Sequence, residues 1–419
     1  MLRFVPPAGT PLEVMDILHA WKASVSAKGK EKDSLEALGA RLRVRHILGA
    51  SSGRAALWLV LKALHRLRPE RNVVALPAYT CFSVAASVVR AGLKLHPLEM
   101  DPATLDADTS GLDTLPRDKL LCILTSNLFG FVNDVSLYKR IAGETGAFLV
   151  DNAAQALGAA RAGNLAGTAG DVGIYSFGRG KALAAMEGGA IVTNKDELAR
   201  ALREEQSQLR NSSLLHRAWL LVELFAYSAL LPPRLYWIAE GMPFLKLGTT
   251  EFDTGFPVHS LDSLSGKLIV HLLDRLGEIN QIRCANAARI TEALDGYGAL
   301  RFPQPAPECQ PTMVRLPVIA RDESTRTRAV IRLRQAGIGA TAFYPSAICD
   351  IPGIERYLAI GNCHRKKAER LSRTLFTLPV HPFVEQRDIE RIIDILGALQ
   401  VDRAPEDVGC QENLSAKRA

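Results

Sequence analysis

The chain has 419 residues, 47% of them hydrophobic, and a formal net charge of +7. This length and apolar content predict a globular protein with a large core, built as one large and one smaller domain or as two similar domains. The positive charge could attract nucleic acid, an anionic membrane or a phosphorylated small molecule, but no basic run carries interleaved aromatic residues, which excludes a nucleic-acid module.

The N-terminal sequence and the cysteines both argue for a cytoplasmic protein. MLRFVPPAGTPLEVMD has prolines and acidic residues where a secretory signal needs an uninterrupted apolar run. The seven cysteines are scattered from Cys81 to Cys410 without a C-x-x-C pair. They predict reduced thiols, with neither a disulfide framework nor a zinc site, and we expect no metal ion.

The N-terminal half predicts a helical arm followed by a large α/β domain. Residues 1–45 have the pattern of two helices, and residues 46–256 alternate short apolar runs with helical patterns. The runs are typical of strands buried on both faces of a mainly parallel sheet, and the helices would cover that sheet. The expected strands are 73–76, 94–100, 120–126, 147–151, 172–176 and 190–193, and the expected helices are 52–67, 82–91 and 135–145.

The C-terminal part predicts a smaller α+β domain over residues 257–402. The expected elements are helices at 261–294, 324–336 and 385–399 and a strand at 312–319. Residues 403–419 are polar and predict a disordered tail.

Residues 203–256 form an apolar insertion in the large domain. A membrane-spanning helix needs about 20 mostly apolar residues, whereas the apolar run from Leu214 to Leu231 has 18, with charged residues among them. Two interpretations stay open. The helix is buried at a domain or subunit interface, or residues 214–247 make a peripheral contact with the inner face of the membrane, with aromatic side chains at headgroup level.

Lys181 lies on a glycine-broken turn between two expected strands, in the stretch IYSFGRGKALAAMEGGAIVTN. An isolated lysine is more often a solvated surface charge. A desolvated amine near other cations, however, has a lowered pKa and can attack a carbonyl to form a Schiff base. Pyridoxal phosphate is the cofactor that most often needs such a lysine.

Two segments offer phosphate donors for this cofactor. Ser52, Gly53 and Arg54 open an expected helix, whose N-terminus presents free N–H groups and a favourable dipole to an anion. Ser-Ser-Gly at a helix start is equally an ordinary N-cap. Ser176, five residues before Lys181, adds a hydroxyl at a strand end.

Together these motifs resemble the DegT/StrS family of pyridoxal-phosphate sugar aminotransferases. The resemblance rests on SSGRAAL, LPAYTCFSVAASVVRAG, NLFGFVNDV, LVDNAAQALGA, YSFGRGK with EGGAIVTN, FYPS and LPVHP, and runs from about residue 45 to 400. It implies a fold-type-I transferase with a large parallel-sheet domain and a small C-terminal domain, usually a homodimer with active sites at the subunit interface. Such enzymes transfer an amino group, typically from glutamate, to a keto group of a nucleotide-linked sugar.

The resemblance also implies roles for single residues. Lys181 matches the Schiff-base lysine and Ser176 a phosphate ligand. Gly53 and Arg54 match the family's Gly-Thr phosphate pair, with arginine as an acceptable phosphate donor in place of threonine. Gln155 matches the polar residue beside the cofactor ring and its hydroxyl.

Asp151 and Asn152 mark a departure from the family. They follow an expected strand at the sheet edge where open α/β sheets bind ligands, although turn and cap roles are equally common for these residue types. In relatives the carboxylate that pairs with the pyridine nitrogen lies three residues before the glutamine, and that position is Asn152 here. An amide cannot hold the ring nitrogen protonated, so transamination is expected to be slow unless a local bend lets Asp151 substitute.

Three further positions complete the predicted site. Cys81 stands where many relatives have a ring-stacking phenylalanine. Tyr344 and His381 lie in loops that approach the active site in relatives, and both are predicted to bind substrate, with a hydrogen-bonded turn histidine as the alternative for His381. The stretch 255–260 lacks the asparagine that relatives often extend to the partner subunit's phosphate.

Two other functions stay open. One is a different pyridoxal-phosphate reaction on a similar sugar, such as deoxygenation, although relatives of that kind replace the lysine with histidine. The other is a catalytically weakened member that serves as a binding or scaffold subunit at the membrane surface, as suggested by Asn152 and the apolar insertion.

Overall fold

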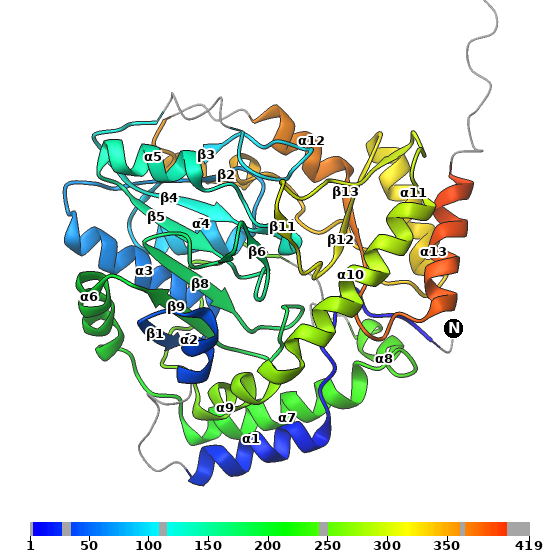
Figure 1. Cartoon of the computed structure of the whole chain (residues 1–419), viewed down its shortest axis with the longest axis horizontal. Helices are drawn as coiled ribbons and strands as arrows, with labels where there is room; N and C mark the ends of the chain where they lie inside the picture. Colours follow the sequence, from blue (N-terminus) through cyan, green and yellow to red (C-terminus); the bar gives the residue numbers. More distant parts are fainter. Residues whose placement is uncertain (1–2, 27–34, 109–114, 243–249, 361–364, 400–419) are drawn as a thin grey trace, which may run out of the picture.

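The computed structural model describes residues 3–26, 35–108, 115–242, 250–360 and 365–399. The tail expected at 403–419 lies outside these ranges. Figure 1 shows a large sheet with helices packed around it, beside a smaller sheet flanked by helices from the C-terminal part of the chain.

The large sheet has seven strands in the order β1-β9-β8-β5-β4-β2-β3. Strands β8, β5, β4, β2 and β3 run parallel, and β9 is antiparallel to both β8 and β1. The expectation of a mainly parallel sheet is therefore confirmed. The strands are β1 (His46–Ala50), β2 (Val73–Pro77), β3 (Lys94–Leu98), β4 (Leu120–Ser126), β5 (Phe148–Asn152), β8 (Val172–Ser176) and β9 (Gly189–Thr193).

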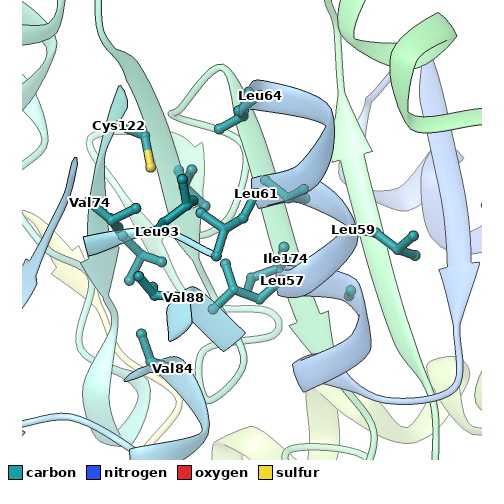
Figure 2. Close-up of a cluster of buried hydrophobic side chains, with 14 of the residues drawn as sticks. Leu57, Leu59, Leu61, Leu64, Val74, Val84, Val88, Leu93, Cys122 and Ile174 are labelled. Atoms are coloured by element: carbon teal, nitrogen blue, oxygen red, sulfur yellow. The ribbon is translucent and has the colours of Figure 1, made fainter. Parts of the chain in front are cut away.

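The helices expected between these strands are present as α3 (Gly53–Leu67), α4 (Phe82–Arg90) and α5 (Ser136–Thr145), and α6 (Asp196–Ser207) follows β9. Figure 2 shows how leucines of α3 meet valines of α4 and side chains of the sheet. Leu61, at the centre, is fully buried, and full burial of one leucine stabilises a fold by about 1.5–3 kcal/mol. This packing fixes the start of α3 against the carboxyl ends of the strands.

The smaller sheet contains β10 (Leu300–Arg301), β12 (Leu316–Ala320) and β13 (Leu375–Leu378). Its buried core includes side chains of α11 (Glu323–Gln335), α13 (Gln386–Ala398) and the N-terminal Val5. The helix expected at 261–294 is divided by a 3₁₀ turn, Leu273–Arg275, into α9 (Ser263–Leu272) and α10 (Leu276–Ala293). The structure also contains α12 (Lys366–Thr374) and a ribbon of β6 (Ala160–Arg161), β7 (Asn164–Leu165) and β11 (Cys309–Gln310).

The N-terminal arm and the insertion lie side by side. The arm forms α1 (Val14–Ser26) and α2 (Glu36–Leu42), and the insertion forms α7 (Leu214–Leu230) and α8 (Tyr236–Glu240). Helix α1 contacts both α7 and α9, along the lower edge of Figure 1. Within the described residues, no helix has the length and apolar character needed to cross a membrane.

Helices α1 and α7 expose an unusual number of large apolar side chains, which we call the α1/α7 apolar face. Large exposed apolar patches are rare on free protein surfaces. It consists of Val14, Met15, Leu18, Trp21 and Val25 of α1 and Leu214, Leu215, Trp219, Val222 and Phe225 of α7.

The division at 1–45, 46–256 and 257–402 stays a prediction. The expectation of reduced thiols is met at Cys81, Cys122, Cys284 and Cys309, which are free, but it was wrong for Cys349, which is disulfide-bonded.

Candidate active site

A cavity of about 890 Å³ lies at the carboxyl ends of the parallel strands. Ser126 of β4, Asn152 of β5 and Ser176 of β8 reach it from three neighbouring strands. Open α/β sheets bind their ligands at this edge. Nine of the eleven residues predicted from the sequence line the cavity: Ser52, Gly53, Arg54, Cys81, Asn152, Gln155, Ser176, Lys181 and Tyr344.

Lys181 lies in the turn between β8 and β9, on the wall of this cavity. Its Nζ forms no hydrogen bond or ion pair with any residue that the structure describes. Burial lowers the pKa of Lys181, and the nearby Arg315 guanidinium lowers it further, while Cys81 acts in the opposite direction. The N-terminal segment supports the turn, because the Thr10 hydroxyl donates to the Lys181 carbonyl oxygen over 3.1 Å. The backbone of the turn is thus held in place, and the amine has no counter-ion among the described residues.

The start of α3 packs directly against this turn. Ser52 is the N-cap of α3, and its hydroxyl oxygen accepts from the Ala55 N–H over 3.1 Å. A Cβ added at Gly53 would lie 2.7 Å from Cβ and 2.9 Å from Oγ of Ser176. A glycine is therefore required where the helix start meets the strand end. The result is a cradle of helix N–H groups and one serine hydroxyl that fits an anion.

Asp151 and Asn152 point in different directions at the end of β5. The Asp151 carboxylate is buried away from the cavity and accepts from Asn127 Nδ2 over 2.7 Å and from the Gly167 N–H over 2.8 Å. The Ala169 N–H and the Thr125 hydroxyl are further donors, at 3.2 and 3.4 Å. Burial raises the pKa of Asp151, and these hydrogen bonds oppose the rise. The structure therefore does not bring Asp151 to the predicted cofactor contact, because the local bend that this would need is absent from β5.

Asn152 reaches the cavity with its amide nitrogen free. The Ala154 N–H donates to Asn152 Oδ1 over 3.1 Å, which settles the orientation of the amide. Among the described residues, Asn152 Nδ2 has no hydrogen-bond partner, and the residue lines the cavity. The side chain consequently offers a donor to a bound molecule and cannot offer its oxygen as readily.

Gln155 and Tyr344 form a hydrogen-bonded pair on the cavity wall. Gln155 Oε1 accepts from the Phe129 N–H over 3.1 Å, and its Nε2 donates to the Tyr344 hydroxyl oxygen over 2.8 Å. Burial raises the pKa of Tyr344 well above its ordinary value, so the phenol keeps its proton. Cys81 lies nearby as the N-cap residue of α4, with its sulfur accepting from the Ser83 hydroxyl over 3.0 Å.

His381 does not line the cavity and contacts the N-terminal segment instead. It is fully buried, and its Nε2 lies 2.8 Å from the Pro6 carbonyl oxygen. The Phe383 N–H donates to Nδ1 over 3.3 Å, so Nε2 carries the proton. Burial lowers the pKa of His381 to about 4, which keeps the ring neutral. The structure corrects the predicted substrate contact and supports the alternative of a hydrogen-bonded turn histidine.

Sequence reasoning missed several ionisable residues on the cavity wall, among them Glu187, His216, His259 and Arg315. Burial lowers the pKa of Arg315 to about 10, and its NH1 donates to the Thr341 hydroxyl over 3.1 Å. A signal was available for Arg315, because it interrupts an otherwise apolar strand-like run at 312–319. The other three come from separate segments, and nothing in their spacing connects them.

Comparison with known proteins agrees with this geometry. The chain is 27% identical over 382 residues to a dTDP-3-amino-3,4,6-trideoxy-alpha-D-glucose transaminase of Streptomyces venezuelae, which covers 90% of this chain and 89% of the relative. It is 33% identical over 194 residues to a pleiotropic regulatory protein of Geobacillus stearothermophilus, covering 46% of this chain. The match spans about half of that relative's length, 52%.

A solved structure shows the same fold. The GDP-4-keto-6-deoxy-D-mannose-3-dehydratase of E coli, with bound hydrated PLP, superposes with a TM-score of 0.73 at 19% identity and covers 94% of this chain and 100% of its own. The model of the DegT/DnrJ/EryC1/StrS aminotransferase family matches residues 11–397. With Lys181 between β8 and β9 and an anion cradle at the start of α3, this chain belongs to the DegT/DnrJ/EryC1/StrS aminotransferase family.

Proposed function

We propose that the chain is a pyridoxal-phosphate-dependent aminotransferase that moves an amino group from glutamate to a keto group of a nucleotide-linked sugar. Membership of an aminotransferase family supports the reaction class. The transaminase from Streptomyces venezuelae, similar over most of both chains, supports a nucleotide-linked sugar as acceptor. The pathway class would be glycan or polysaccharide biosynthesis.

The observation that carries the proposal is the Lys181 amine. It lines the cavity, has a lowered pKa and lacks a counter-ion among the described residues. A lysine amine is nucleophilic only when unprotonated, and burial near another cation favours that form. Lys181 is therefore suited to bind an aldehyde and, once released, to hold and move a proton at its Nζ.

The residues present fit pyridoxal phosphate. The cradle of Ser52, Gly53 and Ser176 would hold the phosphate, and Arg54 adds a cation beside it on the cavity wall. Gln155 would lie by the ring. When bound, this cofactor supplies an electron sink for cleavage of the bond next to the amino group. The chain's own residues would hold the phosphate and the ring and provide the proton carrier.

Arg315 is suited to the carboxylate of the amino-acid donor. Its guanidinium is buried on the cavity wall, close enough to Lys181 to lower that residue's pKa. Among the described residues it forms no ion pair, and a planar guanidinium binds carboxylates through two parallel hydrogen bonds. Tyr344 lies on the same wall and is proposed to contact the sugar.

The test of this function is spectroscopic and kinetic. Purified protein with added pyridoxal phosphate should show a visible absorbance band of lysine-bound cofactor, and Lys181→Ala should lose the band. Glutamate should then shift the wild-type band and yield 2-oxoglutarate. A colourless wild-type protein would rule out the aminotransferase and leave the scaffold function, and a coloured protein that ignores glutamate would rule out glutamate as the amino donor. A band with loss of sugar oxygen instead of glutamate consumption would indicate deoxygenation.

We also propose a cytoplasmic homodimer in which the α1/α7 apolar face is covered by the second copy. The face borders the cavity, because Trp219 and Val222 are both exposed and line it. Analytical ultracentrifugation should give a dimer for the wild type and a monomer for Trp219→Asp with Val222→Asp. A monomeric wild type that cosediments with anionic vesicles, when the double variant does not, would support the alternative peripheral membrane contact by 214–247, of which residues 243–247 lie outside the described ranges.

A further inference from the structure

Three ionisable side chains converge on one side of the cavity, from three separate segments. Glu187 lies in the turn before β9, His216 in the first turn of α7, and His259 in the segment before α9. One ligand atom from each lies within 4.8 Å of the others. All three residues line the cavity and are half-buried. None of them has a role in the function proposed above.

Both histidines present a ring nitrogen to the centre of this cluster. His259 Nδ1 lies 2.9 Å from the Ser260 carbonyl oxygen and can only donate to it, so the proton is on Nδ1 and Nε2 keeps its lone pair. A backbone carbonyl that orients a histidine in this way is the usual support of a metal ligand. The ring of His259 meets that of His216 edge to face, with centroids 4.8 Å apart.

Glu187 supplies the anionic member and has an unused oxygen. Its Oε2 lies 2.8 Å from His216 Nε2, while Oε1 is buried without a hydrogen-bond partner among the described residues. Burial raises the pKa of Glu187, against the effect of the two histidines. An unpartnered carboxylate oxygen at a buried position is costly, and a bound cation would remove that cost.

We propose that Glu187, His216 and His259 bind one divalent transition-metal ion of the zinc class. Two imidazoles and one carboxylate are a donor set that suits zinc and leaves a coordination position open. Ligand atoms that lie about 2.1 Å from a tetrahedral zinc ion are roughly 3.5 Å from one another. The three ligand atoms here lie within 4.8 Å of one another, so small side-chain rotations must shorten the longest of these distances by about 1 Å. The cavity lies beside the open position.

The ion would connect two parts of the molecule. Glu187 is in the same β8–β9 turn region as Lys181, and His216 is in the insertion helix α7. Metal binding would therefore tie the insertion to the turn that holds the amine. It would also replace a single His216–Glu187 pair by a three-point link.

The experiment is a titration of untagged, chelator-treated protein with zinc chloride, followed by calorimetry, and with cobalt(II), followed by visible absorption. We expect one ion per chain, an intense cobalt band typical of four-coordinate geometry, and a raised melting temperature. His259→Ala and Glu187→Gln should each weaken zinc binding by at least about tenfold. His271→Ala is the matched control, because His271 pairs with Asp16 outside the cavity, at 2.9 Å.

The outcomes separate a built site from chance binding. Equal zinc affinity in the wild type, His259→Ala and Glu187→Gln would overturn the proposal, as would no binding at all. If His259→Ala does not fold, Glu187→Gln alone decides, since glutamine keeps the size of the side chain and an acceptor for His216. The readouts do not use enzyme activity, so they stand whether or not the chain transfers an amino group.

Discussion

The two sides of the cavity differ in how closely they match what a pyridoxal-phosphate enzyme needs. On one side, the β8–β9 turn and the start of α3 bring together Lys181 and the anion cradle of Gly53 and Ser176. On the other, the end of β5 presents Asn152 and turns Asp151 away. The first side therefore has the amine and the anion cradle that the proposed cofactor needs, whereas the second offers an amide and no carboxylate to the cavity.

The largest effect is expected from removal of the Lys181 amine. Lys181→Ala should slow the glutamate half-reaction by about 10³-fold or more, equivalent to about 4 kcal/mol, because proton transfer by a positioned base is worth up to about 10⁴-fold. Stopped-flow absorbance measures the rate. Added methylamine should restore part of it in Lys181→Ala, whereas Lys195→Ala, on the surface beside Asp171, should behave as wild type. An unchanged rate in Lys181→Ala would exclude its role.

Removing the charge of Asp151 should instead damage the fold. Asp151→Asn places an amide against donors from Asn127 and Gly167, so one donor faces another in the buried interior. We expect the free energy of unfolding to fall by about 3 kcal/mol, measured by urea denaturation. Asn152→Ala is the control and should cost less than about 1 kcal/mol. Equal losses of stability in the two variants would contradict a structural role for Asp151 that Asn152 lacks.

Sequence patterns predicted the sheet and most of the site because buried strands, glycine turns and helix starts are local features. Lys181, Ser52 and Gln155 reached the cavity as expected. Which of two neighbouring residues faces a ligand depends on strand register and on donors from other segments, such as Asn127 for Asp151. For that reason sequence alone could not decide between Asp151 and Asn152.

The same limit explains His381 and the three-residue cluster. His381 follows β13, and its ring nitrogen is hydrogen-bonded to the Pro6 carbonyl oxygen. Only the path of residues 3–10 in the folded chain reveals this contact. Glu187, His216 and His259 converge because the insertion folds back over the β8–β9 turn, a tertiary event without a spacing signature. Long-range packing, and not local propensity, decides these contacts.

A carboxylate introduced at the end of β5 should speed up the proposed reaction. Asn152→Asp keeps an oxygen for the Ala154 N–H and adds a negative charge at the cavity. If the ring nitrogen lies against this position, as the resemblance to the family implies, the carboxylate holds it protonated and makes a better electron sink. We expect the glutamate half-reaction to accelerate about tenfold, or about 1.4 kcal/mol. A ring-nitrogen ¹⁵N NMR shift measures the protonation directly, and an unchanged shift would show that Asn152 does not contact the ring.

The smallest effect is expected at Tyr344, which is hydrogen-bonded to Gln155 on the cavity wall. Tyr344→Phe removes the acceptor of Gln155 Nε2, 2.8 Å away, and leaves the ring in place against Tyr79 at 5.3 Å. Loss of one such hydrogen bond costs about 1 kcal/mol, so kcat/KM for the keto sugar should fall about fivefold, with cofactor binding unchanged. Tyr357→Phe, outside the cavity-lining set, is the control and should leave both values alone. A loss of cofactor affinity in Tyr344→Phe would place this tyrosine with the anchoring groups and not with those that contact substrate.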